Sequence, residues 1–249
     1  MADAKIIVVG GGPAGSSTAF FLAKQGVNVT LIDRAAFPRD KACSEYMSPE
    51  ASRLLDAMGA LAAVEAAGAI PLAGMRVHSP HGHTIRGTFS ASHGFHGYRD
   101  RGLAVRRTIL DVILIERARE AGVSIEESIR ATDVVRDDSG RATGITVIDK
   151  DGRSSIRQSR LVIGADGLRS VVGRRLGLIQ QSRWPRRIAL VTHFSGVANL
   201  DDFGEMHVAN DGYCGCANVG GGLTNFAIVV PISRSHEISL DREAFLDNW

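Results

Sequence analysis

The chain has 249 residues, enough for one large domain or two smaller ones, and 44% apolar with 22% charged residues is an ordinary globular composition. A formal net charge of +2 argues against the concentrated basic field that nucleic acid or an anionic membrane surface requires. No apolar run approaches the roughly 20 residues that span a bilayer, and no signal peptide is recognised, so a soluble cytoplasmic protein is expected. Three cysteines without a C-x-x-C pair indicate reduced thiols.

The first fifty residues predict a strand, a helix and a second strand. The short apolar run Ile6–Val9 is typical of a buried strand, and helical spacing continues over Ser16–Lys24 until Gly26 stops the helix. Residues 27–31 then alternate apolar and polar side chains in a second strand that leads to Asp33. This order predicts a right-handed βαβ unit.

A glycine motif joins the first strand to the helix. In Gly10-x-Gly12-x-x-Gly15, the first glycine permits the tight turn, the second lets a pyrophosphate approach the backbone, and the third lets helix and strand pack closely. The helix N-terminus offers N–H groups to phosphate, and Asp33 can accept hydrogen bonds from ribose hydroxyls. Because the motif lies between a strand and a helix and the acid is present, we interpret it as a dinucleotide site rather than a plain turn.

Further elements follow in chain order. Ser48-Pro49 is typical of a helix start, as N-cap and first helical residue. A Pro-His-Gly turn predicts a hairpin over Met75–Phe89, and Thr108 is expected to cap a helix that ends at Glu120. Four strands are expected after that helix, namely Val123–Glu126, Ala131–Val135, Thr143–Asp149 and the buried strand Leu161–Ala165.

After Arg187 the pattern changes to short strands and glycine-rich turns, which is typical of an antiparallel sheet. The expected strands are Ile188–Phe194, Glu205–Val208, Gly212–Ala217 and Thr224–Val230. The predicted fold class is α/β, with a Rossmann-like nucleotide-binding domain on a parallel sheet over residues 1–74 and 98–183. An antiparallel-sheet substrate domain of α+β type is expected over residues 75–97 and 184–249, and the predicted hairpin is expected to join its sheet.

Four segments, spread over most of the chain, carry a family resemblance. They are the GGGPAG turn with Asp33-Arg34, the stretch from Phe37 to Ser44 with Met47-Ser48-Pro49, the RTILD element at 107–111, and the GADGLRS segment at 164–170. In them the chain resembles the FAD-dependent oxidoreductases that include geranylgeranyl reductases, aromatic-ring hydroxylases and flavin-dependent halogenases. The second segment is similar to the FPRDKxCGG and LSP stretch of geranylgeranyl reductases, so the likeness is nearest to those members.

The resemblance implies that FAD is the cofactor. Arg39 would meet phosphate or ribityl oxygens, Cys43 and Ser44 would come near the flavin ring, Arg107 would reach the flavin side, and Asp166 would contact ribose or pyrophosphate oxygens. The full set of expected cofactor contacts is Gly10, Gly12, Pro13, Ala14, Gly15, Asp33, Arg34, Arg39, Cys43, Ser44, Arg107, Val134, Asp166 and Gly167.

Two departures from the family pattern affect these expectations. Ser44 stands where the family often has glycine, and its side chain changes the approach to the flavin ring. Family members also carry a Gly-Asp-Ala segment after the substrate-domain sheet, and this sequence reaches Trp249 without one. The substrate domain is therefore expected to be incomplete.

No catalytic acid or base and no metal site are assigned. Five histidines lie in or near the predicted hairpin, but no Asp, Glu or Cys completes a recognisable ligand spacing with His78, His81, His83, His93 and His96. A solvated loop that partly lines the substrate pocket is expected instead. Cys214 and Cys216 would share one face of a strand, where buried packing is favoured over redox pairing.

The resemblance implies a flavin enzyme that receives a hydride from NAD(P)H and then reduces an alkene or hydroxylates an apolar small molecule. The FPRDKxC likeness favours a reductase of an isoprenoid or similar substrate, and a halogenase ranks third because no W-x-W-x-I-P match is present. The missing C-terminal element leaves a second class open, a nucleotide-binding remnant without turnover. The GADG segment disfavours an NAD dehydrogenase.

Overall fold

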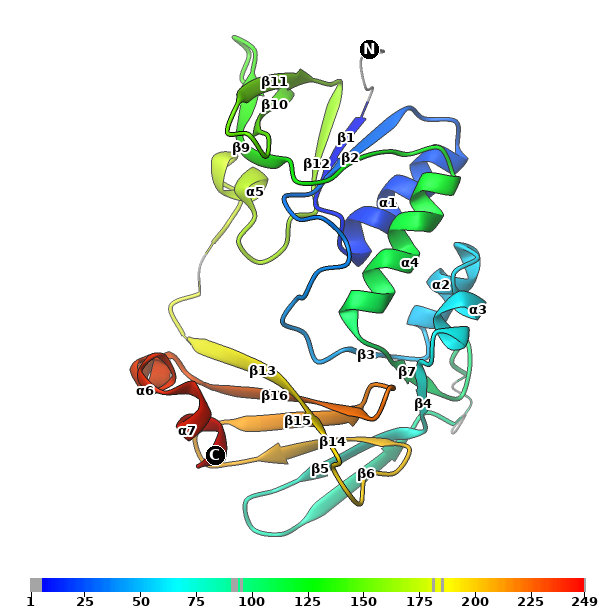
Figure 1. Ribbon diagram of the computed structural model, residues 1–249, viewed down its shortest axis with the longest axis vertical. Helices are drawn as coiled ribbons and strands as arrows, with labels where there is room; N and C mark the ends of the chain where they lie inside the picture. The colour runs from blue at the N-terminus through cyan, green and yellow to red at the C-terminus, as the bar shows by residue number, and fades with distance from the viewer. Residues whose placement is uncertain (1–5, 91–93, 95, 181, 185, 249) are drawn as a thin grey trace. The chain divides into compact units, whose positions relative to one another are not determined.

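The computed structural model describes residues 6–90, 94, 96–180, 182–184 and 186–248. The chain divides into two compact units, each built from three segments (Figure 1). Unit 1 comprises Met1–Asp40, Leu54–Ala67 and Arg107–Gln180, and unit 2 comprises Lys41–Arg53, Gly68–Arg106 and Gln181–Trp249. The domain limits expected from the sequence place residues 41–53, 68–74, 98–106 and 181–183 in the nucleotide-binding domain, whereas these residues belong to unit 2; the expected limits stay a prediction.

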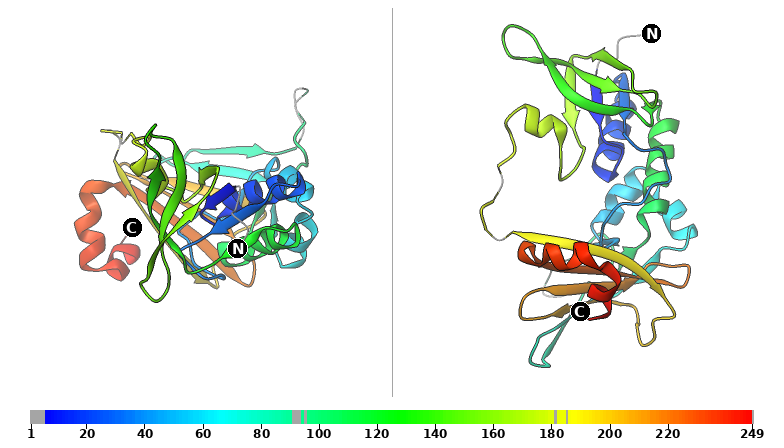
Figure 2. Two further views of the ribbon diagram at one scale, coloured as in Figure 1. Left: turned by 90° about the horizontal axis from the view of Figure 1, so that it is seen from above. Right: turned by 60° about the vertical axis from the view of Figure 1, so that its left-hand side comes forward.

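Unit 1 is built on a four-stranded parallel sheet with the strand order β12-β1-β2-β8. Its strands are β1 (Ile6–Val9), β2 (Val29–Ile32), β8 (Ser124–Glu126) and β12 (Leu161–Gly164). Two long helices, α1 (Pro13–Lys24) and α4 (Arg107–Glu120), lie side by side next to it (Figure 1 and Figure 2). The sequence prediction of a βαβ unit on a parallel sheet is thus confirmed.

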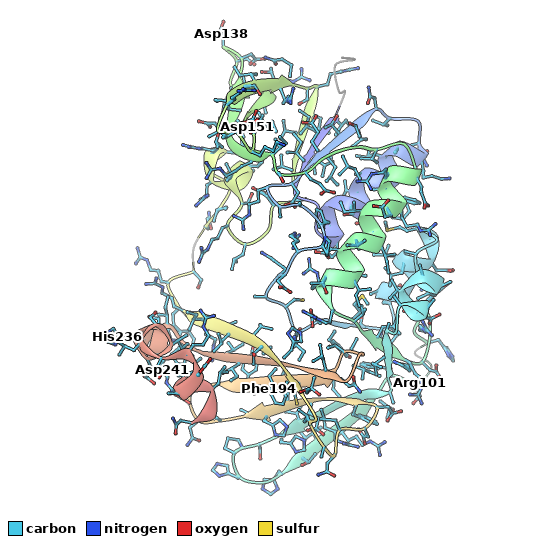
Figure 3. The ribbon with its side chains drawn as sticks, viewed as in Figure 1. Arg101, Asp138, Asp151, Phe194, His236 and Asp241 are labelled. Carbon is cyan, nitrogen blue, oxygen red and sulfur yellow. The ribbon has the colours of Figure 1, made fainter. Side chains whose placement is uncertain are left out.

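A three-stranded antiparallel sheet of β11-β10-β9 packs against the parallel sheet. Its strands are β9 (Arg130–Arg136), β10 (Ala142–Ile148) and β11 (Ser154–Gln158). The shared core is formed by Ile7, Val9, Ile32, Ala131, Val134, Ile145, Val147 and Val172. Asp138 and Asp151, labelled in Figure 3, mark the two turns that join these strands. The short helices of this unit are α3 (Leu61–Ala66), α5 (Val171–Arg175) and the end of α2 (Ala51–Ala57).

Unit 2 contains a six-stranded sheet with the order β13-β16-β15-β14-β5-β6. Its strands are β5 (Gly74–His78), β6 (Thr84–Thr88), β13 (Arg187–Ser195), β14 (Phe203–Val208), β15 (Tyr213–Asn218) and β16 (Leu223–Pro231). All neighbours are antiparallel except β5 and β14, which run parallel, so the predicted hairpin does join this sheet. A small sheet of β3 (Tyr46–Met47), β7 (Gly102–Ala104) and β4 (Ile70–Leu72) completes the strands.

The C-terminal helices pack on one face of the large sheet, over β13, β15 and β16 (Figure 2). A 3-10 turn over Ile232–Arg234 leads into α6 (Ser235–Leu240) and α7 (Arg242–Asp247). Ile238 and Phe245 from these helices pack on Cys214, Ile228 and Val230 of the sheet. No helix among the described residues is long and apolar enough to cross a membrane.

Three local expectations were wrong. Helix α4 begins at Arg107, so Thr108 lies within the first turn and does not cap it. Ser48 and Pro49 belong to a turn closed by i to i−3 hydrogen bonds, such as Ala51 N–H to the Ser48 carbonyl, and α2 starts only at Ala51. Strand β12 is not buried: it pairs on one side only in the described sheet, and Leu161 is 50% exposed. An edge strand of a parallel sheet can have the same apolar composition as a central one, so the sequence does not distinguish the two positions.

Candidate functional site

The glycine turn of unit 1 has the close backbone packing that its motif requires. A side chain at Gly15 would place its Cβ 1.7 Å from the Gly10 carbonyl oxygen, and Gly10 itself has a φ of +106°. Gly12 is different, because a Cβ there would meet only guanidinium nitrogens of Arg107 and Arg39, at 3.5 and 3.6 Å. Gly10 and Gly15 are therefore needed by the fold, whereas Gly12 keeps open a space that faces two cations.

The start of α1 is left open to an anion. Gly12 is the N-cap and provides no side-chain hydrogen bond, Pro13 fills the first helical position, and no acidic residue lies in the first turn. The N–H groups of the first turn, including those of Ala14 and Gly15, point out of the helix end, and no acidic side chain of that turn is present to accept them. Such a terminus binds phosphate groups.

Asp33 lies directly beside this helix end. Its carboxylate is buried, and Oδ2 accepts the N–H of Gly11 at 2.7 Å while Oδ1 accepts the N–H of Ala35 at 2.8 Å. Each carboxylate oxygen offers two lone pairs, so both retain capacity for hydroxyl donors. The exposed Arg34 follows it and lines a separate shallow depression with Arg130 and Lys150.

A buried ion-pair network lies against the same turn. Asp111 on α4 is fully buried and binds Arg107 in a bidentate pair, with Nε to Oδ1 at 2.8 Å and Nη2 to Oδ2 at 2.9 Å. Arg39 Nη1 lies 3.2 Å from Asp111 Oδ2 but makes no hydrogen bond of good geometry, and Arg39 Nη2 lies 4.0 Å from Asp33. The network presents two guanidinium groups to Gly12, and the buried Nη1 of Arg39 has no hydrogen-bond acceptor in the part of the chain that the structure describes.

The GADG segment forms the turn after β12. Asp166 accepts the Ser170 hydroxyl through Oδ1 and the N–H of Val171 through Oδ2, the latter at 2.6 Å, and so fixes the start of α5. Gly167 has a φ of +79°, which favours glycine in this turn. Val134 is buried in the core of unit 1, and its N–H donates to Asp133. The cofactor contacts expected of these residues stay predictions.

Unit 2 holds the other two expected cofactor residues, in the wall of a cavity of about 420 Å³. Cys43 and Ser44 line it, and its other lining residues are mainly apolar, including Met75, Ala189, Val191, Met206, Ala217, Ala227 and Val229. Tyr46 adds a hydroxyl, and burial raises the pKa of this phenol to about 12, so the hydroxyl is neutral at physiological pH. The cavity has the apolar lining with few polar groups that is typical of a small-molecule pocket.

The three free thiols differ in burial, which predicts their reactivity. Burial raises the pKa of Cys214 to about 11 and that of Cys216 to about 12, whereas Cys43 is only half-buried. Since the thiolate is the nucleophile, at pH 8 Cys214 should carry on the order of 100-fold less thiolate than an ordinary thiol. Iodoacetamide at pH 8 should label Cys43 first, with all three thiols reacting in urea, as mass spectrometry of the peptides would show. Equal labelling of Cys43 and Cys214 in the folded protein would contradict this.

The structure also brings together residues that the sequence gave no reason to pair. Glu205 and His207 of β14 lie beside His78 of β5, with His207 Nε2 at 3.0 Å and His78 Nε2 at 3.8 Å from Glu205 Oε2. Arg76 binds the same carboxylate at 3.3 Å, and its positive charge opposes a second cation there. We therefore assign this group to pairing across the two strands. His93, one of the histidines considered above, lies outside the described residues.

The residues of unit 1 fit the phosphates and ribose of FAD. Four features lie together at this turn. They are the space beside Gly12, which a Cβ would begin to fill, and the open N-terminus of α1. The others are the buried Nη1 of Arg39, which has no acceptor among the described residues, and the Asp33 carboxylate with its spare lone pairs. Phosphate oxygens would satisfy the donors, and ribose hydroxyls would satisfy the carboxylate.

Comparison with known proteins also indicates an FAD-binding protein. The FAD binding domain family model matches residues 3–232. The chain is 32% identical over 174 residues to menaquinone reductase from Mycolicibacterium smegmatis, covering 70% of this chain and 40% of that protein. It is 29% identical over 252 residues to digeranylgeranylglycerophospholipid reductase from Methanosarcina acetivorans, covering 98% and 58%. The structure of the flavin-dependent halogenase CmlS aligns with a TM-score of 0.87 at 26% identity, covering 100% of this chain and 45% of that one.

The chain thus spans between 40% and 58% of the length of these three proteins. The family match extends over nearly the whole of it and includes the glycine turn, Asp33, the Arg39 and Arg107 network and the GADG segment. The chain belongs to the FAD binding domain family, and FAD is its cofactor.

Proposed function

We propose that this chain is part of an FAD-dependent reductase that transfers a hydride to an apolar, isoprenoid-like small molecule, with NAD(P)H as the electron donor. The observation that carries the proposal is the cavity of about 420 Å³ in unit 2, whose lining is mainly apolar. Cys43 and Ser44, which the family resemblance places near the flavin ring, stand in its wall. A substrate in this cavity would therefore lie next to residues that face the reactive part of the cofactor.

The names of two relatives support this substrate class. One is a menaquinone reductase and the other a digeranylgeranylglycerophospholipid reductase. Menaquinone and geranylgeranyl lipids both carry isoprenoid chains. Burial of each CH₂ group of such a chain in an apolar cavity makes the free energy of binding more favourable by about 0.8 kcal/mol. The apolar wall would bind such a chain, while the few polar side chains in the lining, those of Ser44, Tyr46, Glu205 and Tyr213, would orient its head.

When bound, FAD supplies the hydride-transfer chemistry, and the protein supplies position and charge. The N-terminus of α1 and the guanidinium of Arg39 would hold the pyrophosphate, and Asp33 would hold the adenosine ribose. Asp111 keeps Arg107 and Arg39 in place by charge pairing. These groups fix the cofactor at the end that does not react.

The first test is the visible absorption spectrum of the purified, desalted chain. We expect flavin bands to persist, or to appear after incubation with FAD, and to bleach anaerobically on addition of NADPH or NADH. Reoxidation by a menaquinone with two isoprene units, or by a geranylgeranyl glycerolipid, would then identify the acceptor. A protein that binds FAD but is not reduced by any donor would favour the alternative of a binding remnant without turnover.

The three free cysteines agree with a reducing compartment, and we propose a cytoplasmic location on that ground. The substrate is proposed to be a small molecule and not a macromolecule, because the cavity is of the size that encloses drug-sized ligands.

A further inference from the structure

An acid, an imidazole and an amide meet inside unit 2, and FAD binding does not account for them. His193 on β13 and Asn225 on β16 are directly opposite each other in the antiparallel ladder. His193 Nε2 lies 2.6 Å from Glu45 Oε2, and the side chain of Asn225 donates to the same oxygen at 3.2 Å. The Glu45 side chain is only 4% exposed and Asn225 is buried, whereas the His193 side chain is 22% exposed.

Counting donors assigns the protons in this cluster. The Asn225 amide has two N–H groups, and they are taken by the Cys43 carbonyl at 3.0 Å and by Glu45. The amide cannot be reversed, because its oxygen would then face these two acceptors. The 3.3 Å approach of Asn225 to His193 Nε2 is therefore no third bond, and a carboxylate at Glu45 accepts Nε2–H from His193. Within the described residues, no hydrogen bond involves His193 Nδ1.

The fold maintains this cluster at a cost. Glu45 has a φ of +56°, a left-handed conformation that non-glycine residues rarely adopt, and its carboxylate is removed from water. The Oδ1 of Asn225 is buried and has no hydrogen-bond partner among the described residues, so it is an acceptor that requires a donor. Strain, a buried carboxylate and an unsatisfied acceptor at one place are features that recur at functional sites.

The cluster borders the apolar cavity. Side chains alternate along a strand with period two, so Val191 and Ala227, which line the cavity, share faces with His193 and Asn225. The third link is Cys43, which lines the cavity and whose carbonyl is held by Asn225. A substrate in the cavity would thus have the His193 ring at one end.

We propose that His193 is the proton donor of the reduction and that Glu45 is its positioning residue. This rests on the proposed function, because reduction of a double bond or a quinone adds one hydride and one proton. The hydride, with its two electrons, comes from reduced flavin. With both ring nitrogens of His193 protonated, its Nδ1–H bond breaks and a new C–H or O–H bond forms on the substrate atom that becomes electron-rich. The neutral ring that remains keeps Nε2–H on Glu45, and Nδ1 regains its proton from solvent at the exposed edge of the ring.

The experiment separates the two half-reactions in His193→Gln and Glu45→Gln chains. Flavin content and the rate of flavin reduction by NADPH should stay at wild-type values, since neither residue holds FAD. The rate of anaerobic flavin reoxidation by the short menaquinone should fall on the order of 100-fold or more in His193→Gln, with unchanged quinone binding, and the solvent deuterium isotope effect should disappear. His207→Gln is the matched control, because His207 also pairs with a carboxylate on this sheet but is exposed.

A second readout needs neither cofactor nor turnover. The ¹⁵N shifts of the His193 ring should show a proton on Nε2 in the wild type, and Glu45→Gln should lose this preference. Wild-type reoxidation rates in His193→Gln, or a proton held on Nδ1 alone, would overturn the proposal. If wild-type flavin is not reoxidised by any acceptor, the proposed function fails instead, and the ring tautomer alone then decides whether the Glu45 and His193 pair exists as inferred.

Discussion

Replacing Asp111 with asparagine is expected to destabilise unit 1 by about 3–5 kcal/mol, the effect of removing one partner from a buried ion pair. Asp111 is fully buried, pairs with Arg107 in two hydrogen bonds, and lies 3.2 Å from Arg39. Asparagine has nearly the same shape but no charge, so two guanidinium groups of low exposure would face each other without a carboxylate between them. Urea denaturation followed by circular dichroism measures the loss.

The matched control is Glu120→Gln on the same helix. Glu120 is 59% exposed and pairs with Arg117 three residues away, at 2.8 Å, so its loss should change the free energy of unfolding by less than about 0.5 kcal/mol. Added FAD should recover part of the stability of Asp111→Asn, because its phosphates supply negative charge to Arg39. Equal destabilisation by the two substitutions would show that the buried network does not hold this turn.

The second large effect separates the roles of two glycines in one motif. Gly15→Ala is expected to prevent correct folding of the βαβ turn, since the new Cβ would lie 1.7 Å from the Gly10 carbonyl oxygen, which is backbone and cannot move aside. Gly12→Ala should fold with nearly wild-type stability, because its Cβ meets only flexible guanidinium ends at 3.5 and 3.6 Å. It should nevertheless lose FAD affinity by a factor of 10 or more, since the methyl group occupies the space for the pyrophosphate.

Two measurements separate these outcomes. Thermal unfolding of the FAD-free chains should place Gly12→Ala within a few degrees of the wild type and Gly15→Ala far below it or without a transition. Fluorescence titration with FAD should then show weakened binding by Gly12→Ala. Unchanged FAD affinity in a folded Gly12→Ala chain would mean that the phosphates do not approach this glycine.

The sequence by itself determined the elements whose signals are local. The βαβ unit follows from the apolar runs, the glycine spacing and Asp33, and these signals lie within about 30 residues. The Met75–Phe89 hairpin and the strands after Arg187 follow from alternation and turn residues, and the structure contains them with small shifts of their ends. The FAD assignment also needed only the ordered motifs of the family, which the comparison confirmed.

Only the tertiary structure decided which distant side chains meet. Asp111 is recognisable as part of an RTILD element, but its contact with Arg39 depends on how α4 packs beside the glycine turn. Likewise the apolar composition of β12 predicts a buried strand, and only its position at the edge of the sheet explains its exposure.

The polar cluster of unit 2 was the least predictable feature. Glu45 lies 148 residues from His193 and 180 from Asn225, and neither partner stands in a motif. Hydrogen bonds over such separations are set by strand pairing and by the left-handed turn at Glu45, and a local sequence pattern carries no information about either.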